Sequence, residues 1–248
     1  MTLSDEELDR YARHIVLPQI GGAGQQRLKA ARVAVIGAGG IGAGALPALT
    51  GAGIGQITIV DDDRVELSNL QRQPLYSGDE LGQPKAALAA RFVEDRNPHV
   101  AVNIVDRRID ASNVDEIIAG HDLIVDGTDN FATRLLVSDA AVRGGITLIS
   151  AAAQQFQGQV ALFRSRPCYR CFVGDAFDAD DCDTCAELGV LGALTGTVGN
   201  FAGLIAIREI VGITPDAAGS LHLLDGLALG WRKIRLVADP ACRACGSA

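Results

Sequence analysis

A short apolar run that ends in closely spaced glycines constrains the fold of this chain more than any other feature. Residues 33–36 read VAVI, and Gly37, Gly39, Gly40 and Gly42 follow in the spacing G-x-G-x-x-G. A buried strand that leads through such a loop into a helix presents backbone N–H groups to a phosphate. The spacing therefore predicts a nucleotide-binding loop, but it suits NAD and ATP equally.

Strand and helix patterns alternate up to about residue 150. Apolar runs of strand length are separated by longer helical stretches, which is typical of a parallel sheet with helices on both faces. A capping-box pair, Ser4 and Glu7, also predicts a helix within residues 4–16. The expected strands cover 32–36, 56–60, 101–106, 146–150 and the first part of 122–130, and the expected helices cover 41–51, 81–95 and 130–143.

The pattern changes in the last third of the chain. Residues 156–164 alternate as an exposed antiparallel strand does, an apolar helix is expected near 196–211, and short strands are expected at 220–225 and 231–237. Neither a repeat nor a clear linker divides the chain. We therefore expect one α/β domain over residues 1–248, with a Rossmann-like, doubly wound, mostly parallel sheet that continues into antiparallel strands.

Composition narrows the class of protein. The 248 residues carry a formal net charge of −8, and only 4% are aromatic. An acidic chain with few aromatic residues is a poor binder of nucleic acid or of anionic membranes. The first residues are polar and no run of 18 uncharged apolar residues occurs, so we expect a cytoplasmic protein without a membrane span.

Polar residues follow the predicted strands at the edge where a nucleotide would lie. Asp61 ends the second strand, and a carboxylate there can accept hydrogen bonds from ribose hydroxyls. Asp62 and Asp63 extend this acidic group, and each can hold a cation or be a solvated strand end. Asp129 and Asn130 follow the fourth strand, where a carboxylate beside a triphosphate commonly binds Mg²⁺.

The loop after the second strand favours a triphosphate. Its sequence over 66–76 is ELSNLQRQPLY, and Asn69, Arg72 and, further on, Lys85 add amide and cationic groups. Cations near a phosphate-binding loop suit three phosphates better than the two of a dinucleotide.

The order of these motifs resembles a known family. GAGGIG, VDDD, SNLQRQ, GQPK and GTDN, with C-x-x-C pairs towards the end, are similar to the ThiF/MoeB/HesA adenylyltransferases, bacterial relatives of the ubiquitin-activating E1 enzymes. The resemblance extends from residue 10 to residue 245. It implies that the glycine loop binds ATP with Mg²⁺. It also implies a small ubiquitin-like sulfur-carrier protein ending in Gly-Gly, whose terminal carboxylate attacks the α-phosphate and releases pyrophosphate.

The resemblance also implies roles for individual residues. Asp61 would bind the ribose, Lys85 and the loop around Arg72 the phosphates, and Asp129 the magnesium ion, whereas Arg13 would reach into the partner's site of a homodimer. The residues implied to bind ATP are Gly37, Gly39, Gly40, Gly42, Asp61, Asp63, Ser68, Asn69, Leu70, Gln71, Arg72, Lys85, Asp129 and Asn130.

Six cysteines form three C-x-x-C pairs, at 168 and 171, 182 and 185, and 242 and 245. A structural zinc site needs two pairs, and in the sequence alone the first two are nearest to each other. The resemblance instead implies a structural site made of Cys168, Cys171, Cys242 and Cys245. It leaves Cys185 as a possible sulfur-transfer thiol, while Cys182 has no counterpart and makes a redox pair with Cys185 conceivable.

The sequence also allows two other functions. An NAD(P)-dependent oxidoreductase would use the same glycine loop, and an E1-like scaffold would keep the fold without catalysis. Within the family, a MoaD-like carrier would place the chain in molybdenum cofactor biosynthesis and a ThiS-like carrier in thiamine biosynthesis. A separate sulfurtransferase would have to supply the sulfur.

Overall fold

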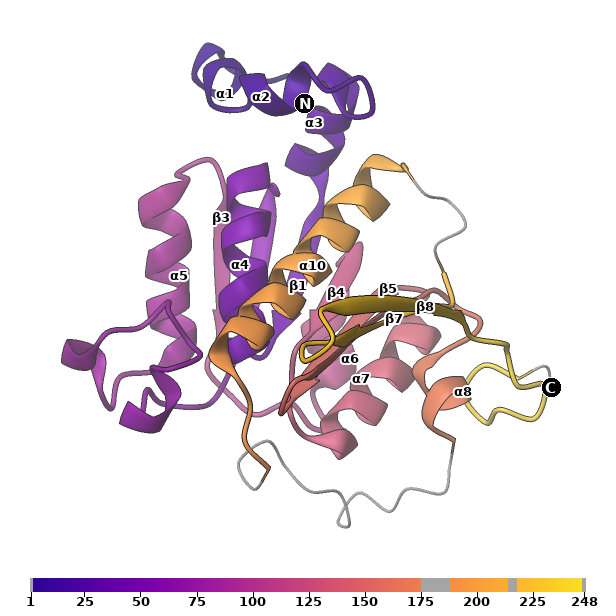
Figure 1. Ribbon diagram of the computed structural model, residues 1–248. Helices are drawn as coiled ribbons and strands as arrows, with labels where there is room; N and C mark the ends of the chain where they lie inside the picture. The colour runs from indigo at the N-terminus through magenta and orange to yellow at the C-terminus, as the bar shows by residue number, and fades with distance from the viewer. Residues whose placement is uncertain (1, 175–187, 214–217, 247–248) are drawn as a thin grey trace.

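The architecture is a single mixed sheet between two layers of helices (Figure 1). The computed structural model describes residues 2–174, 188–213 and 218–246. In the described part the sheet has eight strands in the order β3-β2-β1-β4-β5-β6-β7-β8. The strands are β1 (Arg32–Ile36), β2 (Gln56–Val60), β3 (Ala101–Val105), β4 (Leu123–Asp126), β5 (Thr147–Gln154), β6 (Gln157–Phe163), β7 (Ser220–Asp225) and β8 (Gly230–Arg235).

The change of strand direction falls where the sequence predicts it. Strands β1 to β5 pair in parallel, whereas the pairs β5–β6, β6–β7 and β7–β8 are antiparallel. The mixed, Rossmann-like α/β class is thus confirmed. One detail is wrong: β6 is not an exposed strand, because residues 160–163 are all buried between the two helical layers.

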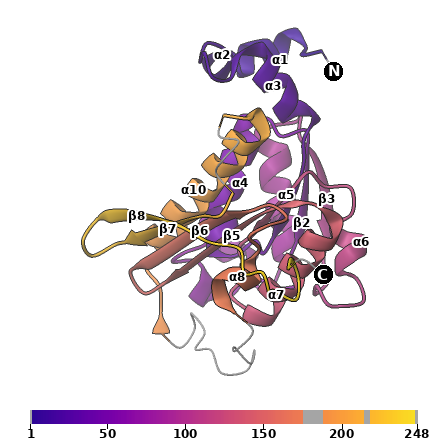
Figure 2. The ribbon, with the colours of Figure 1, turned by 90° about the vertical axis from the view of Figure 1, so that its right-hand side faces the viewer.

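Helices cover both faces of the sheet (Figures 1 and 2). Alternate residues of β1 separate the two cores: Val33 and Val35 face one, and Ala34 and Ile36 face the other. The first core includes residues of α4 (Gly40–Ala52), α5 (Lys85–Arg96) and α10 (Gly192–Val211), and the second includes residues of α6 (Val114–Ile118), α7 (Phe131–Gly144) and α8 (Tyr169–Val173).

The N-terminal helices lie beyond the amino ends of the parallel strands (Figure 1). The predicted capping box is present, since the Ser4 hydroxyl accepts from the Glu7 N–H at the start of α1 (Asp5–Arg10). The single helix expected within 4–16 is divided at Tyr11, whose hydroxyl accepts from Asn97 Nδ2 at 2.9 Å. After α2 (Ala12–Ile15), the unpredicted helix α3 (Gly21–Ala30) leads directly into β1.

Helix α10 is a core helix that packs on α4. Its length and mean hydropathy would suit a membrane span, but half of this apolar stretch is buried inside the protein. It begins at Gly192, four residues before the predicted start, and Trp231 of β8 packs on its Phe201 with ring centroids 4.4 Å apart. Gly199 of α10 lies against Ile41 and Gly44 of α4, so the two backbones approach closely.

We expect the Gly199→Ala substitution to lower the free energy of unfolding by about 1–3 kcal/mol, because the added Cβ would collide with the Ile41 carbonyl oxygen. Gly196→Ala is the matched control on the same helix, since its Cβ would meet open space. Replacing that glycine should leave stability unchanged or raise it by up to about 1 kcal/mol. Urea unfolding measures both, and equal effects would contradict the close helix contact.

Candidate active site

A cleft opens at the carboxyl ends of the parallel strands, as expected for a ligand site in a doubly wound sheet. Its volume is about 320 Å³. It brings together ten of the residues that the sequence predicts to bind ATP: Gly37, Gly39, Gly40, Asp61, Asp63, Asn69, Arg72, Lys85, Asp129 and Asn130. The remaining four, Gly42, Ser68, Leu70 and Gln71, are not among its lining residues.

The glycine loop turns tightly at Gly37, in a backbone conformation that favours glycine. Gly37 has a φ of +89°, and its N–H donates to the Val60 carbonyl at 2.8 Å. A Cβ at Gly42 would collide with the Gly37 carbonyl oxygen, so Gly42 has a packing role beneath the loop. Gly39 precedes the first turn of α4, whose unpaired N–H groups face the cleft.

Asp61 is anchored to this loop. One carboxylate oxygen accepts from the Ala38 N–H at 2.7 Å, and the other accepts from the Asp63 N–H at 2.9 Å. Burial raises the pKa of Asp61, and these two hydrogen bonds oppose the rise. The two backbone N–H groups therefore fix the position of the Asp61 carboxylate beside the loop.

Lys85 and Arg72 place positive charge in the cleft, and each is held by a different neighbour. The Lys85 ammonium is buried and forms an ion pair of 2.8 Å with the exposed carboxylate of Asp63. Arg72 donates from Nη1 to the Ser68 carbonyl at 2.9 Å. Asp63 thus contacts the ammonium group of Lys85, whereas the resemblance implies a direct contact between Asp63 and ATP.

The loop before Arg72 is held mainly by its own contacts. Asn69 is buried, and its side-chain oxygen accepts from the Glu66 N–H at 3.3 Å. Ser68 contacts Glu66, Leu70 packs on a small apolar cluster, and Gln71 donates to the Val190 carbonyl at 3.4 Å. These contacts shape the loop.

The turn after β4 exposes Asp129 and Asn130 above a buried network. Asp126 is fully buried, and its Oδ1 accepts from the Thr128 N–H at 3.0 Å and from the hydroxyl at 2.8 Å. Arg134 donates from Nε to the Thr128 carbonyl at 2.8 Å. Burial raises the pKa of Asp126, whereas the charge of Arg134 lowers it. Asn130 also caps α7, with its oxygen accepting from the Thr133 N–H at 3.0 Å.

Several residues of the cleft were not predicted as site residues. Arg107 and Arg108 follow β3, so the rule that identified the other strand ends could have found them. The others become neighbours of the glycine loop only through the fold. The unpredicted polar lining residues include Gln73, Arg107, Arg108, Arg134 and Thr195.

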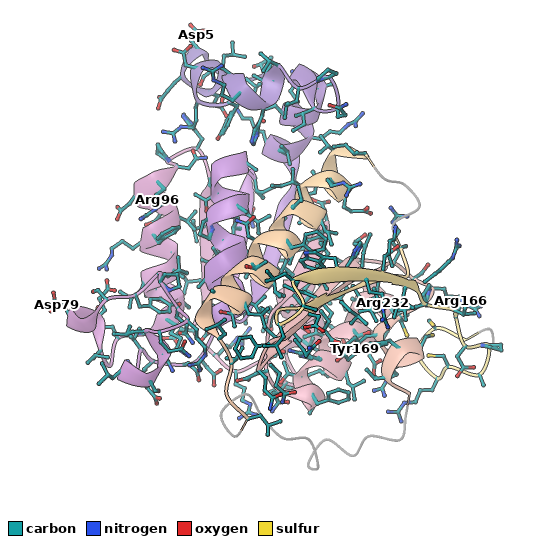
Figure 3. All side chains as sticks on the ribbon, in the orientation of Figure 1. Asp5, Asp79, Arg96, Arg166, Tyr169 and Arg232 are labelled. Atoms are coloured by element: carbon teal, nitrogen blue, oxygen red, sulfur yellow. The ribbon has the colours of Figure 1, made fainter. Side chains whose placement is uncertain are left out.

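Arg13 lies far from the cleft of its own chain. It is exposed on α2, at the amino ends of the strands, whereas the cleft lies at their carboxyl ends. Figure 3 shows Asp5 of α1 at the end of the molecule that the N-terminal helices form.

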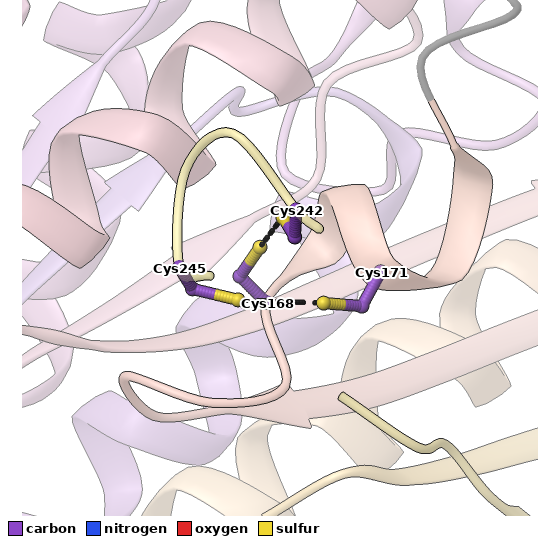
Figure 4. Close-up of side chains that lie close together, drawn as sticks. All are labelled: Cys168, Cys171, Cys242 and Cys245. Atoms are coloured by element: carbon purple, nitrogen blue, oxygen red, sulfur yellow. Dashed lines mark hydrogen bonds between the residues drawn. The ribbon is translucent and has the colours of Figure 1, made fainter. Parts of the chain in front are cut away.

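Four cysteines meet at a second location, beside α8 (Figure 4). The sulfur atoms of Cys168, Cys171, Cys242 and Cys245 all lie within 4.8 Å of one another, with contacts of 3.6 Å and 3.3 Å. These sulfur–sulfur distances are too long for disulfides. They are close to the distance of about 3.8 Å that separates two sulfur ligands in a tetrahedral zinc site with Zn–S bonds of about 2.3 Å. The first and third C-x-x-C pairs therefore come together, while Cys182 and Cys185 lie outside the described residues.

Sheet and cleft together define a nucleotide-binding α/β protein with cations arranged for a polyphosphate. Residues 11–244 match the ThiF family, and the chain belongs to that family. The resemblance seen in the sequence is thereby confirmed.

Sequence similarity to named proteins extends over nearly the whole chain. The sulfur carrier protein adenylyltransferase of Thermus thermophilus is 43% identical, covering 99% of this chain and 93% of that protein. The SAMP-activating enzyme E1 of Haloferax volcanii is 42% identical, covering 99% and 92%. The molybdopterin-synthase adenylyltransferase of Escherichia coli is 37% identical, covering 98% of both chains. The crystal structure of E. coli MccB with ATP has a TM-score of 0.83 at 22% identity, covering 98% of this chain and 75% of that one, which shows a shared fold.

The network below Asp129 yields a stability prediction. Arg134→Ala should lower the free energy of unfolding by about 1–3 kcal/mol, because the Thr128 carbonyl loses its guanidinium donor and buried Asp126 loses a nearby cation. Arg143→Ala on the same helix removes only an exposed ion pair with Asp115 and should change stability by less than about 1 kcal/mol. Chemical denaturation of both variants measures the free energy of unfolding. Equal decreases in the two variants would show that the Arg134 contacts stabilise the fold no more than the exposed ion pair does.

Proposed function

We propose that this chain uses ATP to adenylylate the C-terminal glycine carboxylate of a small ubiquitin-like sulfur-carrier protein. It is an adenylyltransferase, as are its named relatives at about 40% identity over nearly their full length. The observation that carries the proposal is the meeting of Arg72 and Lys85 with the glycine loop and Asp129 in one cleft. An NAD-dependent oxidoreductase has no use for that set of charges, and a scaffold has no need of it.

The reaction requires charge neutralisation and alignment. The carrier's carboxylate oxygen forms a bond to the α-phosphorus, and the bond from that phosphorus to the bridging oxygen of the β-phosphate breaks, so that pyrophosphate leaves. A glycine carboxylate is ionised at pH 7 and is already the nucleophile, so a general base is not required. Cations that bind the leaving phosphates stabilise the charge that develops on them.

Each charged group in the cleft fits one of these tasks. The N–H groups around Gly39 and Gly40 face a phosphate, and the anchored carboxylate of Asp61 accepts from the ribose. Lys85, held by Asp63, and Arg72 neutralise the phosphates. We assign Asp63 to the positioning of Lys85, and Gly42, Ser68, Leu70 and Gln71 to the shape of the loops. None of these five is assigned a direct contact with ATP.

Magnesium fits the turn after β4. Asp129 and Asn130 are exposed there and line the cleft, and carboxylate and amide oxygens are ligands that Mg²⁺ accepts. The ion would neutralise phosphate charge as pyrophosphate leaves. The buried network of Asp126 and Arg134 holds the turn that carries Asp129.

Arg13 fits a homodimer in which each chain completes the partner's site. It is exposed on α2, and the exposed apolar residues Leu8, Val16 and Leu17 lie on the same N-terminal segment. A second copy of the chain that covers this segment would bring Arg13 to the cleft from outside. There it would stabilise charge on the transferring phosphate.

Cys168, Cys171, Cys242 and Cys245 fit a structural zinc ion, because four thiolates leave no open position for catalysis. The ion would tie the C-terminal segment to α8. Tyr169, which starts α8 and is labelled in Figure 3, packs on Phe163 of β6 with ring centroids 5.9 Å apart and so connects this site to the sheet.

The pathway depends on the carrier. A MoaD-like carrier would assign the protein to molybdenum cofactor biosynthesis, and a ThiS-like carrier to thiamine biosynthesis. Sulfur would then come from a separate sulfurtransferase, in the cytoplasm, with Cys185 as the thiol that bonds covalently to the carrier during sulfur transfer. Cys185 and its neighbour Cys182 lie outside the described residues.

ATP–pyrophosphate exchange with a panel of carriers ending in Gly-Gly tests the reaction. We expect exchange with one carrier, and a fall of at least about 100-fold for Asp129→Ala, because the metal ligand is lost. Asp79→Ala, in an exposed turn away from the cleft, is the control and should retain activity. Absence of exchange with every carrier, together with tight NAD(H) binding, would refute the proposed function.

Subunit mixing tests Arg13. Arg13→Ala and Asp129→Ala should each be inactive alone, since each lacks one part of every site. After random exchange of subunits, half of the dimers combine both variants and contain one intact site, so about one quarter of wild-type exchange activity should return. A mixture that stays inactive while heterodimers are present would show that Arg13 does not act across the dimer.

Metal analysis tests the zinc site. We expect about one zinc per chain, lost in Cys171→Ser but retained in Cys182→Ser. Loss of the ion should lower Tm by at least about 4 °C, equivalent to about 2 kcal/mol, because the C-terminal segment is released. Equal zinc content in the two variants would contradict the assignment.

A further inference from the structure

A buried amide lies beside the glycine loop, and its oxygen has no partner in the part of the chain that the structure describes. Gln73 is only 3% exposed, and within the described part of the chain its Oε1 has no hydrogen-bond partner. The same side chain lines the cleft. An unpaired buried polar atom is unfavourable in the free protein, so its presence at the edge of a binding cleft indicates that a ligand supplies the missing partner.

The amide lies directly over the loop where the phosphates would bind. Its Nε2 is 3.6 Å from the position that a Cβ would take at Gly39. On α10, Thr195 approaches the neighbouring Gly40, and Ala153 at the end of β5 also lines the cleft. Gln73 therefore lies in the cleft beside the part of the glycine loop that is proposed to bind the phosphates.

The missing partner must be a hydrogen-bond donor or a cation, and this requirement selects among the substrates. Phosphate oxygens have no hydrogen to donate, and the magnesium ion is assigned above to the turn that carries Asp129, so neither is the partner of this amide oxygen. The ribose hydroxyls are assigned to Asp61, which follows β2 and is anchored to the glycine loop. A peptide N–H is a donor, and the last peptide N–H of the carrier is separated from the attacking carboxylate by a single Cα.

We propose that Gln73 binds the terminal glycine of the sulfur-carrier protein. Its Oε1 accepts the last peptide N–H, and its Nε2 donates to the carboxylate. The two bonds hold the carboxylate over the loop at Gly39 and select a chain that ends at the correct length. This inference rests on the function proposed above and adds a substrate-contacting residue to it.

Equilibrium binding tests the contact. The carrier that supports exchange is titrated, with a non-hydrolysable ATP analogue present, into the wild type and into Gln73→Met, which keeps the volume of the side chain. The same carrier without its last glycine is titrated in parallel. We expect Gln73→Met to weaken binding of the intact carrier about tenfold and to leave binding of the shortened carrier and of the nucleotide unchanged.

Two further variants make the result specific. Gln83→Met alters an exposed glutamine outside the cleft and should change none of these affinities. Gln73→Glu keeps an acceptor oxygen but places a negative charge beside the carboxylate, so it should weaken the intact carrier more than Gln73→Met does. Thermal unfolding of ligand-free Gln73→Met should give a Tm no lower than that of the wild type, because an unpaired buried amide has been removed.

Other outcomes would overturn the proposal. Equal weakening of the binding of the intact and shortened carriers would show that Gln73 does not contact the last glycine. A selective loss of nucleotide affinity would show that Gln73 contacts ATP instead. A lower Tm for the ligand-free Gln73→Met variant, without selective loss of the intact carrier, would make the residue structural. Failure of the wild type to exchange with any carrier would instead refute the proposed function itself.

Discussion

Backbone contacts among the ends of three strands form the foundation of the cleft. The Gly37 N–H donates to the end of β2 at 2.8 Å, and the Gly127 N–H donates to the end of β1 at 2.9 Å. Side chains do not fit among these contacts. Gly37 has a φ of +89°, which favours glycine, and a Cβ at Gly42 would meet the carbonyl oxygen of Gly37. Because Asp61 is bonded to the same loop, the positions of the loop and of the proposed ribose contact are set together.

The charges of the cleft depend on neighbours that hold them in place. Lys85 is buried against Asp63, and Arg134 is bonded to the turn that carries Asp129. Although the chain has a net charge of −8, several cationic side chains line the cleft where a polyphosphate would bind. The neutral amide of Gln73 beside them provides a different kind of contact, suited to a peptide end.

Much of the fold was predictable because the relevant signals are local. Strands β1 and β2 begin and end at the predicted residues, since each is a short, mostly apolar run that ends just before a glycine or an aspartate. Helix α3 was not predicted, because its first turn contains three glycines and its stability comes from packing of Leu28 into the first core. Helix α5 begins at Lys85 and not at 81, because Pro84 holds an extended conformation before it.

The sequence by itself determined the α/β class, the glycine loop and most of the polar strand ends, because each depends on residue types at fixed spacing within one element. It could not decide which two cysteine pairs meet, since Cys168 and Cys242 are 74 residues apart and approach only when the antiparallel strands and the C-terminal segment have folded. Nor could it distinguish Gln73, which is buried at the cleft and whose Oε1 has no partner among the described residues, from its exposed neighbour Gln71. Burial and hydrogen-bond partners are properties of packed surfaces, and only the tertiary structure brings those surfaces together.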